Sequence, residues 1–309
     1  MSVSRRDLLA LSAAAATAAA LPRTGHAADP AEPFGYSFNT STVRGQKLPI
    51  DQVARLVGGA GYNAIEPWIN ELQAYARAGG NLKDLGKLFA DLGLKVESSI
   101  GFARWIVDDA AERQKGLDEA KRDMEMVLTV GGTRIAAPPV GATDKPIGDL
   151  NVVADRFRTL AELGAKIGVI PECEVWGFSK SLSKLGETVL VAMESGHPQA
   201  CVLPDVYHLF KGGSGFEGLK FLHGKSIGIF HVNDYPRDKD RGAIKDADRV
   251  FPGDGVAPLK DVFRTLRDIG YRGMISLELF NPEYYKRDAG EVVKEGLAKT
   301  KAAVRSALS

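Results

Sequence analysis

The sequence predicts one α/β domain folded as a (β/α)8 barrel. Strand-like and helix-like segments alternate eight times, and no two strand-like segments follow each other directly. Parallel strands need a crossover connection, usually a helix, so this order predicts a parallel sheet. Eight such units in a chain of 309 residues fit a closed barrel. An open doubly wound sheet is the alternative, but residues 39–42 (NTST) lack the glycine-rich phosphate loop usual there.

The first half of the barrel is predicted from short apolar runs and from well-marked helix ends. Apolar residues recur at helical spacing, a proline lies near the start of the first helix, and glycines follow the first three. In chain order we expect strand 34–38, helix 49–57, strand 62–66, helix 82–92, strand 94–100, helix 110–130, strand 134–137 and helix 152–167.

The second half follows the same alternation. Glycine closes the first of its helices, and the last helix is rich in Ala, Lys and Glu. In chain order we expect strand 167–174, helix 182–195, strand 201–205, helix 216–222, strand 227–231, a long polar loop 233–255, helix 258–269, strand 274–278 and helix 284–309.

The N-terminus is typical of an export signal. Residues 4–9 (SRRDLL) match a twin-arginine start, residues 8–21 are a short Ala/Leu stretch, and residues 25–27 (GHA) offer a small-residue cleavage site. The apolar stretch is shorter than the roughly 20 residues that span a bilayer, although an uncleaved anchor helix is the alternative. We therefore expect a signal peptide over residues 1–27, a mature barrel over residues 28–309, and a periplasmic location without stable membrane insertion.

The charge balance excludes several classes of partner. The formal net charge is +1, and no run of basic residues of the kind that binds nucleic acid is present. We therefore expect a small-molecule partner and no nucleic acid. The sequence leaves open whether the protein is a monomer or a homo-oligomer.

Four consecutive predicted strands end in side chains that bind metals. They end in Glu174, Asp205, His231 and Glu278, in that order. Active sites of such barrels lie at the carboxyl ends of the strands, where neighbouring strand ends are about 5 Å apart. Three carboxylates and one imidazole suit a single divalent ion, Mn²⁺ or Mg²⁺ first and Co²⁺ or Zn²⁺ as alternatives. The sequence therefore predicts one divalent metal site.

Each of these residues taken alone has an ordinary structural explanation. A histidine at a strand end is more often a structural hydrogen-bonding group, and a glutamate there is more often solvated. Their matched positions on four successive strands favour the metal site. Glu172 is the fallback for Glu174, because the two side chains share a face of the strand. Glu172 would lie one layer deeper, where an ionised carboxylate needs its own partner.

The chain resembles the xylose-isomerase-like TIM-barrel sugar isomerases and epimerases, in particular the tagatose-3-epimerase and inosose-metabolism branches. The resemblance covers residues 34–309 and rests on five short motifs. They are EVW (174–176), DVYH (205–208), FHVNDYPR (230–237), PGDG (252–255) and LE (277–278).

The resemblance implies roles for individual residues. The Glu, Asp, His and Glu at the four strand ends would bind one divalent metal, and Glu174 and Glu278 would also be the acid/base pair. His208 and Arg237 would contact substrate oxygens. A metal that chelates a ketone oxygen and a neighbouring hydroxyl acidifies the adjacent C–H, and the metal and Arg237 would stabilise the resulting enediolate. The implied activity is isomerisation or epimerisation of a keto sugar or keto-cyclitol.

Several further residues are candidates for lining the substrate pocket. Trp68, Trp105 and Trp176 follow strand ends, where aromatic rings stack on sugar faces. Packing in the core or at the rim is the alternative for each. Glu66 ends the second predicted strand, and either lines the pocket or is paired structurally.

Three other functions remain alternatives. A lyase or dehydratase would use the same enediolate to expel a leaving group from a related keto sugar. A non-enzymatic sugar-binding barrel would not need carboxylates at both acid/base positions. A phosphodiesterase like the endonuclease-IV branch would need extra histidines, whereas the second and third strands end in Glu66 and residues 98–99 (SS).

Overall fold

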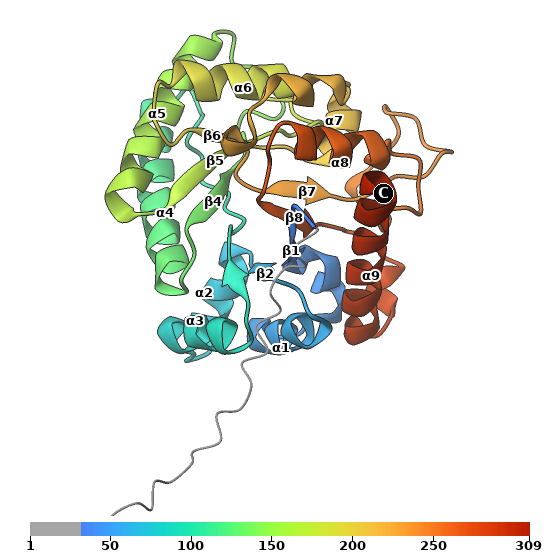
Figure 1. Cartoon of the computed structure of the whole chain (residues 1–309). Coiled ribbons are helices and arrows are strands. Elements are labelled where there is room, and N and C mark those ends of the chain that lie inside the picture. Colours follow the sequence, from blue (N-terminus) through green and yellow to red (C-terminus); the bar gives the residue numbers. More distant parts are fainter. Residues whose placement is uncertain (1–31) are drawn as a thin grey trace, which may run out of the picture.

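The predicted (β/α)8 barrel is confirmed by the computed structural model, which describes residues 32–309. The predicted signal peptide of residues 1–27 lies outside the described residues. Parallel strands form an inner ring surrounded by helices (Figure 1). The strands are β1 (Gly35–Asn39), β2 (Ala64–Glu66), β3 (Lys95–Val96), β4 (Arg134–Ala137), β5 (Ile170–Glu174), β6 (Cys201–Leu203), β7 (Phe230–Val232) and β8 (Met274–Leu277).

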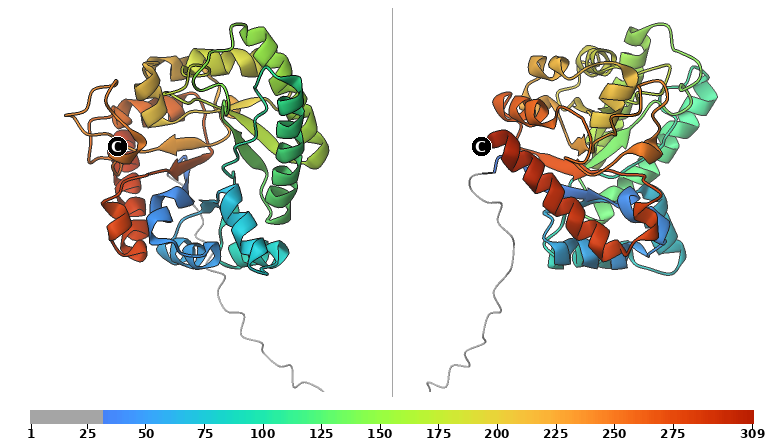
Figure 2. Two further views of the ribbon diagram at one scale, coloured as in Figure 1. Left: turned by 180° about the vertical axis from the view of Figure 1, so that it is seen from behind. Right: turned by 90° about the vertical axis from the view of Figure 1, so that its right-hand side faces the viewer.

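The helices form the outer layer, as the two further views show (Figure 2). The α-helices are α1 (Ile50–Ala60), α2 (Ile69–Arg77), α3 (Leu82–Asp91), α4 (Ala110–Thr129), α5 (Leu150–Ile167), α6 (Leu185–Glu194), α7 (Val206–Gly212), α8 (Leu259–Asp268) and α9 (Ala289–Leu308). Short 3₁₀ helices are η1 (Thr40–Gln46), η2 (Glu217–Phe221), η3 (Gly224–Ser226), η4 (Asp246–Asp248) and η5 (Tyr284–Lys286). Within residues 32–309, no helix combines the length and apolar character needed to cross a membrane.

Backbone hydrogen bonds close the ring between two ladders, β3-β2-β1-β8-β7 and β4-β5-β6. On one side, Ser99 N–H donates to the Arg134 carbonyl (3.2 Å) and Ala136 N–H to the Ser99 carbonyl (2.9 Å). On the other side, His231 N–H donates to the Pro204 carbonyl at 3.0 Å. The last helix, α9, packs against both α1 and α8 (Figure 2). It therefore completes the helical layer between the first and the eighth strand–helix units.

The local differences from the predicted elements have physical causes. Helices α2 and α7 were not predicted, because each begins directly after a strand end and leaves no separate polar turn as a start signal. The predicted helix at 216–222 is instead the shorter 3₁₀ helix η2, a segment that contains Gly218. Strand β3 pairs over only two residues, where seven were predicted.

The long loop after β7 is held in place by one buried carboxylate. The side chain of Asp234 accepts backbone N–H bonds from Tyr235 and Ala257, both at 2.8 Å. It also accepts bonds from Gly253 (3.0 Å) and Gly255 (3.1 Å). A side chain at Gly255 would lie 2.3 Å from the Asp234 carboxylate oxygen, so only glycine allows this approach. Asp234 also pairs with Val250 through the backbone, which fixes the neighbouring Arg249.

A buried aspartate in the helical layer gives the fold a pH dependence. Asp123 on α4 is buried, and burial together with nearby Glu119 raises the pKa of its carboxyl to about 7. The unfolded chain ionises this carboxyl near pH 4. Stability from the protonated group is therefore complete below about pH 4, and it is lost as pH rises toward 7.

We expect the Asp123→Asn variant to be more stable than the parent at pH 8, because the neutral amide avoids burying a charge. The midpoint of thermal unfolding should rise by about 2–4 °C for each kcal/mol gained. This gain should shrink as pH falls toward 4, and thermal unfolding followed by circular dichroism measures it. A shift of equal size at pH 4.5 and pH 8 would contradict the assignment.

Candidate metal centre

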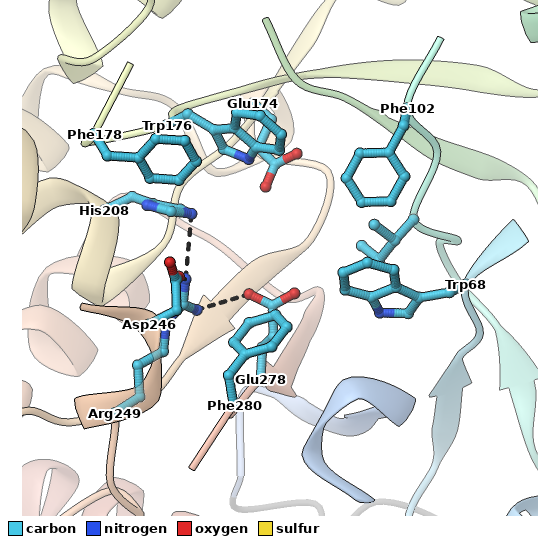
Figure 3. A pocket seen from close by; sticks show the side chains of 11 residues that line it. Trp68, Phe102, Glu174, Trp176, Phe178, His208, Asp246, Arg249, Glu278 and Phe280 are labelled. Carbon is cyan, nitrogen blue, oxygen red and sulfur yellow. Dashed lines mark hydrogen bonds and ion pairs between the residues drawn. The ribbon is translucent and has the colours of Figure 1, made fainter. Parts of the chain in front are cut away.

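The candidate site is a pocket of about 220 Å³ at the carboxyl ends of the strands. Figure 3 shows Trp68 and Phe102 on one side of the pocket, and Trp176 and Phe178 beside Glu174 and His208 on the other. The polar lining residues are Glu174, His208, Asp246, Arg249 and Glu278. The fold therefore brings side chains from β5, β8, α7 and the loop after β7 to one cavity.

Three of the four predicted metal ligands lie close enough together to share one ion. Asp205, His231 and Glu278 each offer a donor atom, and these atoms all lie within 4.8 Å of one another. All three residues are buried. Asp205 and His231 face each other because β6 and β7 are joined by a backbone bridge at these two residues.

Of these three residues only Glu278 lines the pocket, and Asp205 and His231 lie beneath it. Glu174 also lines the pocket but is not part of this three-residue group. Its carboxylate points across the cavity toward Glu278 (Figure 3). Oxygen Oε2 is buried without a hydrogen-bond partner, and burial raises the pKa of Glu174 well above its usual value. Its carboxylate therefore borders the cavity and would have to approach the other three to act as a fourth ligand.

The fallback residue Glu172 lies one layer deeper, as the strand alternation requires. Its Oε2 accepts a hydrogen bond from Ser98 Oγ at 2.7 Å, and the residue is not among those that line the pocket. Burial raises the pKa of Glu172 to about 7. Glu174 is therefore the strand-five glutamate that faces the cavity.

Arg249 is a buried cation that pairs with two of the candidate ligands. Its Nη1 lies 3.1 Å from Asp205 Oδ2 and 2.7 Å from Glu278 Oε2, and its side chain is buried. Its Nη2 contacts Asp246 Oδ1 at 2.5 Å and lies 3.3 Å from His208 Nε2. The guanidinium compensates the charge of two carboxylates that would otherwise be buried together.

The pKa values of Glu278 and His231 are shifted in opposite directions. Burial alone would raise the pKa of Glu278, but His231 and Arg249 hold it below its usual value. Burial alone would lower the pKa of His231, but Glu66 and Glu278 raise it well above its usual value. These residues therefore form an ion pair, with His231 Nδ1 3.4 Å from Glu278 Oε2.

His208 lies in the pocket beside Arg249, one turn after Asp205. The Asp205 carboxylate caps helix α7 by accepting the His208 backbone N–H at 2.8 Å. Burial, followed by the nearby Arg249, lowers the pKa of His208 well below its usual value, so the imidazole is neutral. Its substrate contact stays a prediction.

Two aromatic residues singled out from the sequence, Trp68 and Trp176, line the pocket together with Phe102 (Figure 3). The ring centres of Trp68 and Phe102 are 5.1 Å apart. Trp68 is fixed on its outer side by Arg44, whose guanidinium lies 3.7 Å from the ring centre. This wall suits an apolar ring face of a ligand.

Three residues that were predicted as pocket contacts, Trp105, Arg237 and Glu66, do not line this pocket. Trp105 is fully buried in the core, where its indole N–H donates to the Pro138 carbonyl and its ring packs against Phe157. Arg237 is exposed and is not among the residues that line the pocket. Glu66 is fully buried and contacts His231 instead of the cavity, which is the structural pairing given as its alternative.

The sequence predicted Arg237 as the arginine in the pocket, whereas the structure places Arg249 there. The two residues occupy the same long loop after β7, and spacing within such a loop does not show which arginine turns inward. The available signal was local, since Arg249 begins an apolar run (RVF) inside a polar loop. That run is where the loop pairs with Asp234.

The donor set fits a divalent cation. Two carboxylates and one imidazole converge, with the Glu174 carboxylate nearby, and this mixture suits Mn²⁺, Mg²⁺, Co²⁺ or Zn²⁺. Buried atoms that lack hydrogen-bond partners face this region, namely His231 Nδ1 and Glu174 Oε2. A cation held by Asp205, His231 and Glu278 would satisfy His231 Nδ1, and it would satisfy Glu174 Oε2 if that carboxylate moved toward it.

Residues 54–303 match the family described as xylose isomerase-like TIM barrel. The chain belongs to this family. The match covers seven of the strands, and all the strand-end residues discussed above from Glu66 onward.

The relatives include inosose isomerases and a 3-dehydroshikimate dehydratase. Inosose isomerase of Bacillus licheniformis is 33% identical over 58% of this chain and 65% of its own length. That match therefore spans less than two thirds of the relative. Inosose isomerase of Bacillus velezensis is 28% identical over 86% of this chain and 96% of its own length. 3-Dehydroshikimate dehydratase of Pseudomonas putida is 23% identical over 78% of this chain and 38% of its own length.

Among solved structures, the IOLI protein with a bound zinc atom superposes with a TM-score of 0.82. It is 25% identical and covers 88% of this chain and 99% of its own. Isomerases and epimerases are therefore among the relatives of this chain.

We expect Arg249→Leu to destabilise the metal-free protein by about 3–5 kcal/mol, because two buried carboxylates lose their cation. The deficit should shrink in saturating Mn²⁺, because a bound cation compensates the same carboxylates. Urea unfolding in EDTA and in Mn²⁺ measures both effects. Arg237→Leu, on the exposed part of the same loop, is the control and should change stability by less than about 0.5 kcal/mol. An equal deficit with and without Mn²⁺ would count against a cation site here.

Proposed function

We propose that this protein is a divalent-metal-dependent isomerase or epimerase that moves a proton on a keto sugar or keto-cyclitol. The observation that carries the proposal is the pair of glutamates, Glu174 and Glu278, which face each other across one pocket (Figure 3). Two carboxyl groups on opposite sides of a substrate can remove a proton from one face and return it to the other face or to the next carbon.

The roles follow from the environment of each glutamate. Glu278 is held as a carboxylate by Arg249 and His231, so it is suited to accept the proton of an acidic C–H. Glu174 is buried without a partner at Oε2, and its raised pKa suits a group that donates a proton. Pairs of carboxyl groups with divergent pKa values are typical of acid/base sites. A bound cation would lower the pKa of both groups.

The cation would supply Lewis acidity: a divalent ion held by Asp205, His231 and Glu278 would polarise a ketone oxygen and acidify the neighbouring C–H. The zinc bound to the IOLI protein supports a metal at this centre. The donor set leaves Mn²⁺ and Mg²⁺ as our first expectation, with Co²⁺ and Zn²⁺ as alternatives.

Substrate oxygens would be held by groups on the charged side of the pocket. Arg249 takes the role assigned to Arg237 by resemblance, because its guanidinium borders the cavity beside Glu278. There it would stabilise the negative charge of an enediolate. Neutral His208, 3.3 Å from Arg249, is the second candidate for binding a substrate hydroxyl. The aromatic wall with Trp68 and Trp176 would cover the apolar face of a sugar ring.

A lyase acting on a related keto sugar is the second candidate function. It is supported by the 3-dehydroshikimate dehydratase relative, whose name denotes loss of water. Both reactions begin with loss of a proton beside the carbonyl to Glu278. They differ in the second step, where the electron pair either takes a proton from Glu174 or expels a leaving group.

We further propose that the protein is exported by the twin-arginine route and acts in the periplasm. The support is the sequence of residues 1–27, with its paired arginines at 5 and 6. This route carries folded proteins, which suits an enzyme that binds its metal before export. Fractionation of cells that produce the full chain, with Arg5→Lys/Arg6→Lys as the comparison, tests this proposal. Equal periplasmic amounts of both would contradict it.

We expect the protein with Mn²⁺ to catalyse exchange of solvent deuterium into keto sugars or keto-cyclitols beside the carbonyl, followed by NMR. EDTA should abolish the exchange, and added Mn²⁺ should restore it. Exchange that persists in EDTA would contradict a metal-dependent reaction. The absence of exchange across a broad panel would count against proton abstraction.

We expect Glu278→Gln to lower the exchange rate by about 10²–10⁴-fold, because the amide cannot accept the proton. Glu283→Gln is the matched control, because Glu283 follows the same strand and is exposed and paired with Lys286. The fold of both variants is checked by circular dichroism. Full exchange activity in Glu278→Gln would remove this residue from the mechanism.

A further inference from the structure

Glu66 lies directly behind His231, on the side away from the pocket. It ends β2 and is fully buried. Its two carboxylate oxygens lie 3.0 and 3.1 Å from His231 Nε2. Oxygen Oε2 also accepts hydrogen bonds from Asn39 Nδ2 (2.9 Å) and Ser276 Oγ (2.7 Å). Donors from β1, β7 and β8 therefore converge on one carboxylate.

This contact fixes which nitrogen of His231 faces the candidate ligands. A carboxylate can only accept hydrogen bonds, so Nε2 carries a proton toward Glu66. The opposite ring nitrogen, Nδ1, lies 3.4 Å from Glu278 Oε2 and 3.8 Å from Asp205 Oδ2. Nδ1 is buried and has no hydrogen-bond partner. It is therefore the nitrogen available to a cation.

Asn39 couples this pair to the rest of the site. Its amide nitrogen donates to Glu66 Oε2 and also to Glu278 Oε1, at 2.9 and 3.1 Å. Its carbonyl oxygen accepts the Trp68 indole N–H at 2.8 Å. One side chain therefore sets the positions of Glu66, of one oxygen of Glu278 and of the aromatic wall. The other oxygen of Glu278, Oε2, is left to face Arg249 and His231.

We propose that Glu66 is the positioning residue of the metal centre. By accepting the Nε2 proton, it fixes the tautomer and the ring orientation of His231, with Nδ1 directed at the cation held with Asp205 and Glu278. Removing such a partner of a metal-bound histidine typically lowers metal affinity by about 10–100-fold. The inference rests on the proposed function only in requiring that the centre binds a divalent ion, and it does not depend on the reaction catalysed.

The test compares Glu66→Gln with Glu71→Gln in the full barrel. The first variant keeps the shape of the side chain but removes its charge and places an NH₂ group among the donors of Asn39 and Ser276. Glu71 lies near the same strand end and is the matched control. Within residues 32–309 its carboxylate accepts hydrogen bonds from Thr40 and from the Trp68 backbone, and none from His231. Titration calorimetry of the metal-free proteins with Zn²⁺ and Mn²⁺ should show affinity about 10–100-fold weaker in Glu66→Gln and unchanged in Glu71→Gln.

A second readout reports on the histidine itself. In protein labelled with ¹⁵N-histidine and loaded with Zn²⁺, the NMR spectrum of His231 should show a protonated Nε2 and a metal-bound Nδ1. A purely structural role of Glu66 would leave this spectrum unchanged in the variant. If Glu66→Gln does not fold, Ser276→Ala removes one bond to the Glu66 carboxylate and should weaken Zn²⁺ binding by a few-fold, since less of the orienting network is lost.

The outcomes separate the two proposals. Parent-like affinity and an unchanged His231 spectrum in folded Glu66→Gln would overturn the positioning role while leaving the metal centre intact. Failure of the parent itself to bind Zn²⁺ or Mn²⁺ would overturn the metal centre and this inference together.

Discussion

The structure depends on compensating several carboxylates that are buried at one end of the barrel. Glu66, Asp205 and Glu278 are almost completely shielded from water. Glu174 and Glu278 border the cavity. Burying ionised carboxyl groups together is strongly unfavourable unless cations and hydrogen-bond donors surround them. His231 and Arg249 supply positive charge beside these carboxylates. A divalent cation would add further positive charge. The need to compensate these buried carboxylates is therefore the reason why the fold suits a metal centre.

A few structural features place the compensating charges and hydrogen-bond donors around these carboxylates. Strand ends deliver the acidic side chains and His231 to one rim, because all strands of the barrel run in the same direction. The Asp234 side chain accepts hydrogen bonds from backbone N–H groups of the loop after β7. These bonds fix the loop that carries Arg249. Asn39 joins the buried carboxylates to the aromatic wall. These supports lie outside the pocket, so the reactive groups remain accessible to a ligand.

Strand ends could be predicted from the sequence, whereas contacts made by loops could not. Asp205, His231 and Glu278 each close an apolar run, and parallel strands bring such ends together whatever the connecting loops do. Arg249 and Arg237 share one long loop, and only the fold decides which of them turns inward. Trp105 is similar, because the loop that carries it folds back into the core. The pairing of Glu66 with His231 joins residues 165 positions apart, a separation that local patterns do not encode.

The most direct test of the central claim is diffraction from crystals of the protein soaked in Mn²⁺, with the anomalous signal recorded. We expect one strong peak per chain, within bonding distance of Asp205, His231 Nδ1 and Glu278, with Arg249 withdrawn from Asp205 and the Glu174 carboxylate closer to the ion. An empty centre at saturating Mn²⁺, with Arg249 still bonded to both carboxylates, would contradict the account.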